Sequence, residues 1–319
     1  MKADYFLSRI PGLVQEFAGT RVLVLGDSML DQYTRGVVPR MSPEAPVPVF
    51  HTTTVSHVLG GAANVAHNVS TLGAETRLVT LVGNDAAFGN LSSLLDSAGI
   101  GRSSLFVDTD RPTTLKNRIV DDRGQQLMRF DYESTAPLSD ILERQIIDSL
   151  SENIAWSDVI IFSDYAKGFF TQRIVSETIA IARSLGKLVV ADIKPANKAL
   201  FAGVDLITPN RREAQEMTGI DDVAHAAQSL ADVFSSSVCI TCGADGMVLY
   251  DGSGAVTHIP ATHSDPVDVT GAGDTVVAVI ALALQKGCSL SESAQLANIA
   301  GGLVVRKSGT ATLSPAEFG

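Results

Sequence analysis

The residue types best suited to chemistry are concentrated in residues 266–275, Pro-Val-Asp-Val-Thr-Gly-Ala-Gly-Asp-Thr. Gly271 and Gly273 allow backbone N–H groups to approach a ligand closely, and the apolar run at residues 276–284 predicts a buried helix. The start of such a helix offers unpaired N–H groups and the positive end of a dipole, which suit a developing phosphate charge. Asp274, in the first turn, can accept the proton of an attacking hydroxyl. An ordinary helix start, where the aspartate only favours the dipole, fits equally well.

Residues 268–274, Asp-Val-Thr-Gly-Ala-Gly-Asp, resemble the DTxGAGD signature of the ribokinase-like sugar kinases, the PfkB family. The resemblance implies that Asp274 is the catalytic base. It also implies an anion hole made by three backbone groups, those of Gly271, Ala272 and Gly273. Asp268 is then expected on the substrate side, although Asp268 and Thr270 are also good N-cap types for the helix.

Length and composition limit the class of protein. With 319 residues, 45% of them hydrophobic, the chain can form one large α/β domain or two smaller ones, and general disorder is excluded. The formal net charge of −11 argues against a nucleic-acid partner, but small phosphorylated ligands need only a few local cations. No apolar run reaches the roughly 18 residues that span a bilayer, and the N-terminus lacks a signal-peptide pattern. We expect a soluble, cytoplasmic protein with no membrane partner.

The cysteines and histidines favour structural roles. Three cysteines do not make a disulfide framework, and Cys239 and Cys242 lie in a predicted strand and turn, where residues three apart point to opposite faces. A redox or zinc role for this C-x-x-C is therefore disfavoured. The six histidines show no ligand spacing such as HExxH, so a dedicated histidine metal site is not expected.

Strands and helices alternate along the chain. An amphipathic helix is predicted over residues 5–18, broken at Pro11–Gly12, and a buried strand follows at 21–25. Strand, turn and helix then repeat, as in residues 75–101, which is typical of a parallel sheet with crossover helices. Further elements are predicted as strands at DVIIFSD, KLVVADIKP and DLITPN, three strands within 235–260, and a helix at 293–306. We expect one α/β domain over residues 1–319, of the ribokinase-like kind that the resemblance implies, with no second domain after Gly319.

Two segments interrupt this alternation and predict a small separate β-sheet. Residues 35–55 are rich in proline, and prolines forbid a helix and restrict a strand to an edge. Residues 112–133 have the pattern of a β-hairpin that turns at 121–124. We expect segments of about 33–58 and 110–133 to pair as a lid over the main sheet.

Candidate acceptor-binding residues lie near the first strand and near a later one. The resemblance implies a sugar ligand at Asp31, in GDSMLDQY, and further sugar contacts from the helix start GGAANVA, at Gly60, Gly61 and Asn64. A turn carboxylate and a closely packed helix of small residues are the alternatives. Asp164 and Lys167 follow another strand at its carboxyl end, where open α/β sheets bind ligands. Lys167 is placed to neutralise the transferring phosphoryl group.

The predicted hairpin is cationic, with Lys116, Arg118, Arg123 and Arg129. Lys116 and Arg118 share strand parity, so both point to one face. Such a face in an acidic protein suits a substrate that already bears a phosphate, because Arg binds phosphate bidentately. Solvated charges that protect an edge strand from aggregation are the alternative.

Candidate nucleotide-binding residues lie toward the C-terminus. Residues 210–213 resemble the family's N-x-x-E motif, which implies contacts to Mg²⁺ and the nucleotide phosphates from Asn210, Arg211, Arg212 and Glu213. Glu213 is the expected metal residue, directly or through water, although Asn and Glu three apart also make a capping box. Residues 241–246 resemble the family's T-x-G-x-x-G nucleotide loop, which implies contacts from Thr241, Gly243 and Gly246. Asn298 is expected near the adenine.

Over nearly the whole chain the resemblance narrows to the D-glycero-β-D-manno-heptose-7-phosphate kinases. It is carried by GDSMLDQY, RMSPEAPVPV, GGAANVA, the hairpin, SDYAKG, TPNxxE and the tail KSGTAT. It implies phosphoryl transfer from ATP, with Mg²⁺, to the 1-hydroxyl of the heptose phosphate, giving the 1,7-bisphosphate for ADP-heptose and lipopolysaccharide core synthesis. A dependence on a monovalent cation stays open, and some relatives carry a fused adenylyltransferase domain. A homodimer through the lid is expected, because exposed edge strands permit pairing.

Two other functions stay open on the sequence. The first is a kinase for another sugar or sugar phosphate, such as ribose or fructose 1-phosphate, and the cationic hairpin favours a phosphorylated acceptor. The second is a non-catalytic sugar- or nucleotide-binding regulator, which the intact Asp274 disfavours. A dinucleotide-binding oxidoreductase is excluded because no G-x-G-x-x-G follows the first strand, and no Walker-type G-x-x-x-x-G-K is present.

Overall fold

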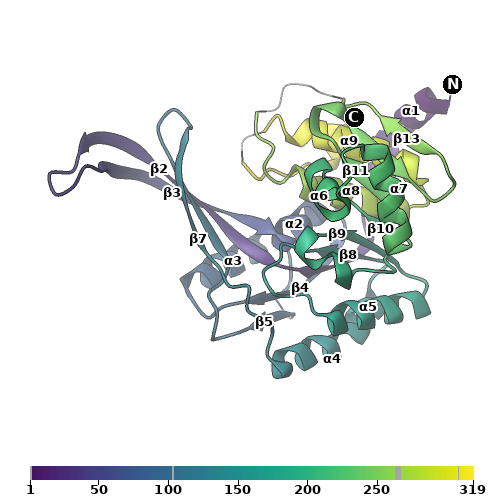
Figure 1. Ribbon diagram of the computed structural model, residues 1–319, viewed down its shortest axis with the longest axis horizontal. Coiled ribbons are helices and arrows are strands. Elements are labelled where there is room, and N and C mark those ends of the chain that lie inside the picture. Colours follow the sequence, from purple (N-terminus) through teal and green to yellow (C-terminus); the bar gives the residue numbers. More distant parts are fainter. Residues whose placement is uncertain (1, 103, 263–266, 308) are drawn as a thin grey trace.

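A long, mostly parallel sheet forms the body of the protein, whose computed structural model describes residues 2–102, 104–262, 267–307 and 309–319 (Figure 1). Its strands lie in the spatial order β13 (Val256–Ile259), β12 (Met247–Tyr250), β11 (Ser237–Thr241), β10 (Leu206–Ile207), β9 (Leu188–Asp192), β8 (Val159–Ser163), β1 (Arg21–Gly26), β4 (Glu75–Val82) and β5 (Leu105–Val107). The strands from β11 to β5 are parallel, and β12 and β13 extend the sheet antiparallel. The predicted α/β fold is confirmed.

The central strands are buried on both faces, which explains their continuous apolar sequences. In β1, Val22 and Val24 belong to one hydrophobic cluster, and Leu23 and Leu25 belong to a second cluster on the opposite face. Cys239 and Cys242 divide in the same way between the two clusters, as their spacing predicts. Both thiols are buried, and burial raises the pKa of Cys239 to about 12.

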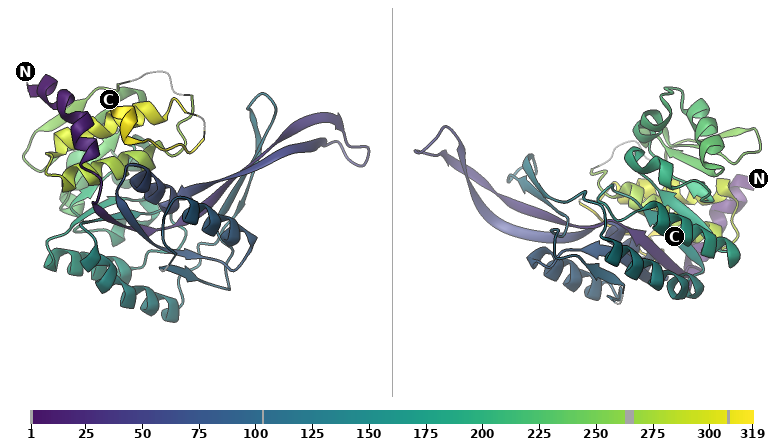
Figure 2. Two further views of the ribbon diagram at one scale, coloured as in Figure 1. Left: turned by 180° about the vertical axis from the view of Figure 1, so that it is seen from behind. Right: turned by 60° about the horizontal axis from the view of Figure 1, so that its bottom comes forward.

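Helices cover both faces of this sheet (Figure 2). The first face packs against α1 (Lys2–Gln15), α2 (Ala62–Thr71), α3 (Ala86–Ser97), α8 (Ala272–Gln285) and α9 (Leu290–Val304). The second face packs against α4 (Asp140–Trp156), α5 (Gln172–Ser184), α6 (Arg211–Thr218) and α7 (Val223–Phe234). Short 3-10 turns complete the chain at η1 (Pro195–Leu200), η2 (Gly243–Asp245) and η3 (Pro315–Phe318). None of the helices in the described residues is long and apolar enough to cross a membrane.

The first helix differs from the sequence prediction, because α1 continues through Pro11 instead of breaking there. Proline removes a backbone N–H and normally costs about 3 kcal/mol inside a helix. Here, however, Phe6 and Ile10 before the proline and Leu13 and Val14 after it are all buried in the first cluster. The apolar burial on both sides offsets the lost hydrogen bond.

A second, four-stranded sheet forms the lid, which projects from the body (Figure 1). Its order is β3 (Pro48–Gly61), β2 (Ser28–Met41), β6 (Leu115–Val120) and β7 (Gln126–Tyr132). The hairpin of β6 and β7 forms as predicted, and β6 pairs with residues 30–35 of β2 in parallel. Pro39 lies beyond that pairing, where β2 has only β3 beside it and the register shifts. On the side of β2 that faces away from β3, Pro39 has no strand partner, so its missing N–H breaks no hydrogen bond there.

Candidate active site

The N-terminus of α8 is exposed to ligands by its glycine cap. Gly271 is the N-cap residue, with φ of 78°, and no side chain caps the helix within the described residues. The N-cap predicted from Asp268 or Thr270 is wrong. Instead, the Asp268 carboxylate accepts hydrogen bonds from the backbone N–H groups of Thr270 and Gly309, both at 2.9 Å. Asp268 thus joins this loop to the C-terminal segment, because each of its oxygens satisfies a loop amide.

Asp274 lies in the first turn of α8 and is only 2% exposed. The Tyr165 hydroxyl donates to Oδ1 and the Asn64 amide donates to Oδ2, each at 2.7 Å. Burial raises the pKa of Asp274 to about 6, against the lowering effect of these hydrogen bonds and of Lys194. A carboxylate with this pKa is largely ionised at neutral pH and close enough to it to act as a base.

A buried polar chain supports this carboxylate from behind. Thr275 donates to the Oδ1 of Asn68 at 2.7 Å, and the Asn68 amide donates to the backbone oxygen of Asn64 at 2.9 Å and to its Oδ1 at 3.4 Å. Both polar atoms of the Asn64 side chain are therefore used inside the protein. The predicted sugar contact Asn64 instead donates to Asp274, the predicted base. The i, i+4 spacing of Asn64 and Asn68 on one helix was the available sequence signal for Asn68.

The glycines before α2 are required by close packing. A Cβ at Gly60 would lie 2.7 Å from Oδ2 of Asp31, and a Cβ at Gly61 would lie 2.3 Å from the backbone oxygen of Asp27. Gly61 also has φ of 58°. The two glycines therefore let β3 and α2 approach the residues that follow β1.

The loop that carries Tyr165 is organised by two buried carboxylates. Asp27 accepts hydrogen bonds from the backbone N–H groups of Tyr165, Lys167 and Phe169, at 2.9, 3.1 and 3.1 Å. The predicted acceptor ligand Asp164 is fully buried and accepts from the amides of Ala166, Lys194 and Asn197. Burial raises the pKa of Asp27 to about 6 and also raises that of Asp164. These two aspartates shape the loop from inside.

One face of the lid sheet carries the predicted cations. Lys116 on β6 lies opposite Asp31 on β2, and Arg118 on β6 lies opposite Arg129 on β7. Lys116 and Arg118 are two residues apart on the same strand, so both point to one face of the lid sheet, as predicted. Arg118 donates to Asp31 at 2.5 Å, in an ion pair whose side chains are only 13% and 5% exposed. Lys116 lies 5.6 Å from the centre of the Tyr165 ring, and burial lowers its pKa.

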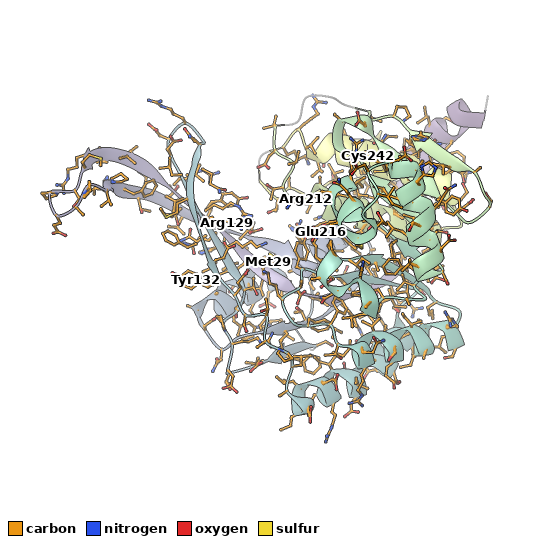
Figure 3. All side chains as sticks on the ribbon, viewed as in Figure 1. Met29, Arg129, Tyr132, Arg212, Glu216 and Cys242 are labelled. Atoms are coloured by element: carbon orange, nitrogen blue, oxygen red, sulfur yellow. The ribbon has the colours of Figure 1, made fainter. Side chains whose placement is uncertain are left out.

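Arg129 and Lys167 pair with acidic neighbours, whereas Arg123 is exposed in the turn between β6 and β7. Arg129, labelled on the lid in Figure 3, binds Asp131 at 2.8 Å and is 46% exposed. Lys167 binds Glu133 at 2.8 Å. Arg129 and Asp131 lie on β7, and Glu133, the partner of Lys167, directly follows that strand.

The predicted nucleotide loop lines a cavity that ends at α8. The cavity has a volume of about 200 Å³ and includes Thr241, Gly243, Gly246, Asn298, Ala272 and Gly273. Its walls are largely apolar and small, which suits a planar ring with a few polar contacts. Asn298 donates its amide to the backbone oxygen of Pro260 at 2.7 Å. The structure therefore brings the T-x-G-x-x-G loop, Asn298 and the start of α8 into one site.

The N-x-x-E motif forms the predicted capping box of α6. Asn210 accepts from the Glu213 amide, and Glu213 Oε2 accepts from the Asn210 amide, both at 2.9 Å. The other oxygen, Oε1, accepts from Lys194 Nζ at 2.5 Å. Arg211 and Arg212 are exposed on this helix, where Arg211 pairs with Asp245 at 2.6 Å and Figure 3 labels Arg212.

Asp192 and Lys194, at the end of β9, connect the two halves of the site. Burial raises the pKa of Asp192 to about 7. Burial opposes the charge of Lys194, but Asp192 and Glu213 outweigh it and raise the pKa of this lysine. Sequence reasoning placed both residues at a strand end without assigning them roles, and it missed Tyr165 entirely.

No group of three or more His, Cys, Asp or Glu side chains in the described residues is arranged to hold a metal ion. Mg²⁺ in kinase sites usually keeps several waters and needs only one or two carboxylates besides the phosphates. Glu213, whose Oε1 accepts from Lys194 Nζ, fits that pattern through water.

Comparisons with known proteins agree with this geometry. A family model for the pfkB family carbohydrate kinases matches residues 20–317. The chain is 42% identical to the bifunctional protein HldE of Caulobacter vibrioides over 322 residues, and 40% identical to that of Bradyrhizobium diazoefficiens over 315 residues. These matches cover 99% and 96% of this chain but only 65% and 63% of the relatives.

Solved structures show the same fold. An Arabidopsis thaliana ribokinase complexed with ribose and ATP aligns with a TM-score of 0.74 at 20% identity, covering 94% of this chain and 97% of that one. Ribokinase from Thermotoga maritima aligns with a TM-score of 0.70 at 23% identity, covering 94% of this chain and 98% of that one. The fold is ribokinase-like, and the chain belongs to the pfkB family of carbohydrate kinases, phosphotransferases that act on a sugar hydroxyl.

Proposed function

We propose that this chain phosphorylates the 1-hydroxyl of D-glycero-β-D-manno-heptose 7-phosphate with ATP, for ADP-heptose and lipopolysaccharide core synthesis. One observation carries the proposal. Ala272 and Gly273, just before Asp274 on α8, line the small-residue cavity, and Tyr165, which donates to Asp274, contacts Lys116 on the half-buried cationic face of the lid. A donor nucleotide on one side and an anionic acceptor on the other would meet at this carboxylate. The similarity to HldE proteins supports the heptose phosphate over other acceptors.

In this mechanism Asp274 accepts the proton of the attacking hydroxyl. The hydrogen bonds from Tyr165 and Asn64 occupy one lone pair on each oxygen, so each oxygen can still accept another hydrogen bond. The dipole at the start of α8 and the N–H groups of Gly271 and Gly273 would stabilise the developing charge on the phosphoryl oxygens, which is the main catalytic requirement in phosphoryl transfer. The third group of the predicted anion hole, the Ala272 N–H, donates to the Val269 backbone oxygen at 3.3 Å and would have to exchange that bond for the phosphoryl group. Glu213 would hold Mg²⁺ through water together with the nucleotide phosphates, and the bound ion would supply further charge neutralisation.

The acceptor phosphate requires cations on the lid. Lys116 has no ion pair that would compete for it among the described contacts, and its lowered pKa reflects the cost of burying an unpaired ammonium. An incoming phosphate would relieve that cost. Arg118 stays with Asp31, where it can orient the carboxylate toward sugar hydroxyls.

The lid also supports a homodimer. The face opposite Lys116 and Arg118 carries exposed apolar side chains at Met128, Phe130 and Tyr132 on β7 and at Val55 on β3. Exposed apolar side chains that share one sheet face in this way favour contact with another protein surface. We infer that two lids pack through this face.

Substitution of the base tests the assignment. Asp274→Asn keeps the shape of the side chain but replaces one acceptor oxygen with an NH₂ donor and removes its basicity, so kcat should fall roughly 10²–10⁴-fold with ATP binding preserved. Turnover is measured by coupled ADP release with heptose 7-phosphate, sedoheptulose 7-phosphate, fructose 1- and 6-phosphates, ribose and fructose.

Each outcome of that assay is informative. The highest kcat/KM for the heptose phosphate supports the proposal. A preference for ribose or fructose would reject the phosphate-binding role of the lid, and wild-type turnover by Asp274→Asn would reject the base. ATP binding without turnover of any acceptor would favour a binding regulator.

A further inference from the structure

Tyr165 contacts three parts of the site at once. Its hydroxyl donates to Asp274 Oδ1 at 2.7 Å. Its ring centre lies 5.6 Å from Lys116 Nζ, on the lid, and 5.0 Å from Lys194 Nζ, which binds Glu213 on the nucleotide side. A Cβ at Gly61 would touch the same ring at 3.4 Å. Base, acceptor side and nucleotide side therefore meet at one aromatic side chain.

The loop around Tyr165 is held in a costly conformation. Ala166 adopts φ of 54°, a left-handed conformation that costs a non-glycine residue roughly 1–2 kcal/mol. Gly168, with φ of 88°, is also confined, because a Cβ there would lie 2.5 Å from the Ala136 carbonyl. Three amides of residues 165–169 bind the single buried carboxylate of Asp27. Strain of this kind persists where surrounding contacts over-determine the backbone, which is common next to active sites.

The Asp274 carboxylate is held at two points. Asn64 donates to Oδ2 from α2, and Tyr165 donates to Oδ1 from the loop after β8. One donor on each oxygen prevents rotation of the carboxylate about its Cβ–Cγ bond, which either donor alone would permit. The second lone pair of each oxygen then points in a defined direction.

We propose that Tyr165 is a positioning residue for phosphoryl transfer, whose hydroxyl fixes the orientation of the Asp274 carboxylate and keeps it ionised. This inference rests on the proposed function, in which Asp274 is the base. Tyr165 does not exchange a proton in the reaction. Burial and the neighbouring Asp274 raise the pKa of its phenol well above the usual value, so the hydroxyl stays a donor at every assay pH.

The charges around Asp274 set the direction of the expected effect. Asp31 on β2 and Asp192 on β9 favour its neutral form, whereas Lys194 and the two hydrogen-bond donors favour the carboxylate. Removing the Tyr165 hydroxyl takes away one of the stabilising contacts. The Asp274 pKa should therefore rise above its value of about 6. As the pH is lowered, the carboxylate should then be protonated at a higher pH than in the wild type.

The test is the pH profile of kcat/KM for the wild type and Tyr165→Phe, with the best acceptor of the panel. Phe keeps the ring and its packing, so folding is preserved. We expect the acid limb to move upward by about one pH unit, because a hydrogen bond to a charged group is worth about that much. At pH 6.5 kcat/KM should fall about threefold, the loss should approach tenfold near pH 5 and shrink toward pH 9, and KM for ATP should be unchanged.

Tyr250→Phe is the matched control, since Tyr250 lies on β12 and packs against the second hydrophobic cluster. It should reproduce the wild-type profile. An acid limb of Tyr165→Phe that coincides with wild type, or a loss that is equal at every pH, would overturn the proposal. Asp274→Asn separates this result from failure of the proposed function: if that variant is inactive while the Tyr165→Phe limb is unmoved, the base stands and the positioning role falls.

Discussion

At the scale of single residues, the site concentrates buried carboxylates. Asp27, Asp192 and Asp274 are all less than 8% exposed, and burial raises their pKa values to about 6, 7 and 6. Three backbone amides bind Asp27, Lys194 lies near Asp192, and Asp274 is in the first turn of α8, so each burial is partly compensated. The arrangement favours chemistry at the expense of stability, because ionised groups are held away from water.

Asp192 gives a prediction about pH and stability. Its pKa is about 7 in the folded chain against an ordinary value of 3.8, so between about pH 4 and pH 7 the folded state holds a proton that the unfolded state has lost. Stability should therefore decrease as pH rises through this window. Asp192→Asn removes this titration, and its melting temperature should fall less than that of the wild type between pH 5 and pH 8.

The measurement is thermal unfolding at several pH values. Asp122→Asn, an exposed position in the turn between β6 and β7, is the control and should keep the wild-type slope. An unchanged slope in Asp192→Asn would show that Asp192 does not titrate in this range.

At the scale of elements, two ion pairs on one lid face differ in burial. Arg118 and Asp31 join β6 to β2 with little exposure, whereas Arg129 and Asp131 lie within β7 and are 46% and 24% exposed. Breaking a buried pair leaves an uncompensated charge, which costs about 3–5 kcal/mol, while an exposed pair is worth about 0–1 kcal/mol.

Arg118→Met should therefore destabilise the lid strongly and raise KM for the acceptor, and Arg129→Met should cost little stability. Urea unfolding and acceptor kinetics measure the two effects. Asp31→Asn in the Arg118→Met background should recover part of the lost stability, because the buried charge is removed. Equal losses in the two arginine variants would contradict the role given to the buried pair.

Two helices offer a matched comparison of capping boxes. Glu213 closes the box of α6 and also binds Lys194, whereas Glu292 closes the box of α9 and lies away from the site. Glutamine also closes a capping box, so Glu213→Gln and Glu292→Gln should both lose less than about 1 kcal/mol. Only Glu213→Gln should lower kcat, by roughly tenfold, and raise the Mg²⁺ concentration needed for half-maximal rate. Similar kinetics in both variants would leave the N-x-x-E motif as a helix cap alone.

At the scale of the whole molecule, the two faces of the lid sheet differ in chemistry. Its cationic face meets the body at Tyr165, and its opposite face exposes Phe130 at 46% and Met128 at 55%. Figure 1 shows that the lid projects from the body, so a partner can approach it without obstruction. A second copy of the chain would bury this apolar surface.

Phe130→Glu should convert the proposed dimer to a monomer, because it places a charge in the centre of the apolar face. Sedimentation velocity across a concentration series measures this. Val233→Glu, at a 63% exposed position on α7, is the control and should leave the assembly unchanged. A monomeric wild type at all concentrations would contradict dimerisation.

The sequence by itself determined most of the elements and the position of Asp274, the proposed base. Apolar runs in β1, β4 and β8 specify buried parallel strands, and the glycines beside Asp274 specify an open helix start, because both signals are local. Tertiary structure alone decided which groups meet. Pro11 stays helical because distant apolar contacts outweigh the lost hydrogen bond. Tyr165, Asn64 and Asp274 come from three separate segments, and no spacing along the chain predicts that they hydrogen-bond. Strand register and burial depend on the whole fold, and they determine these contacts.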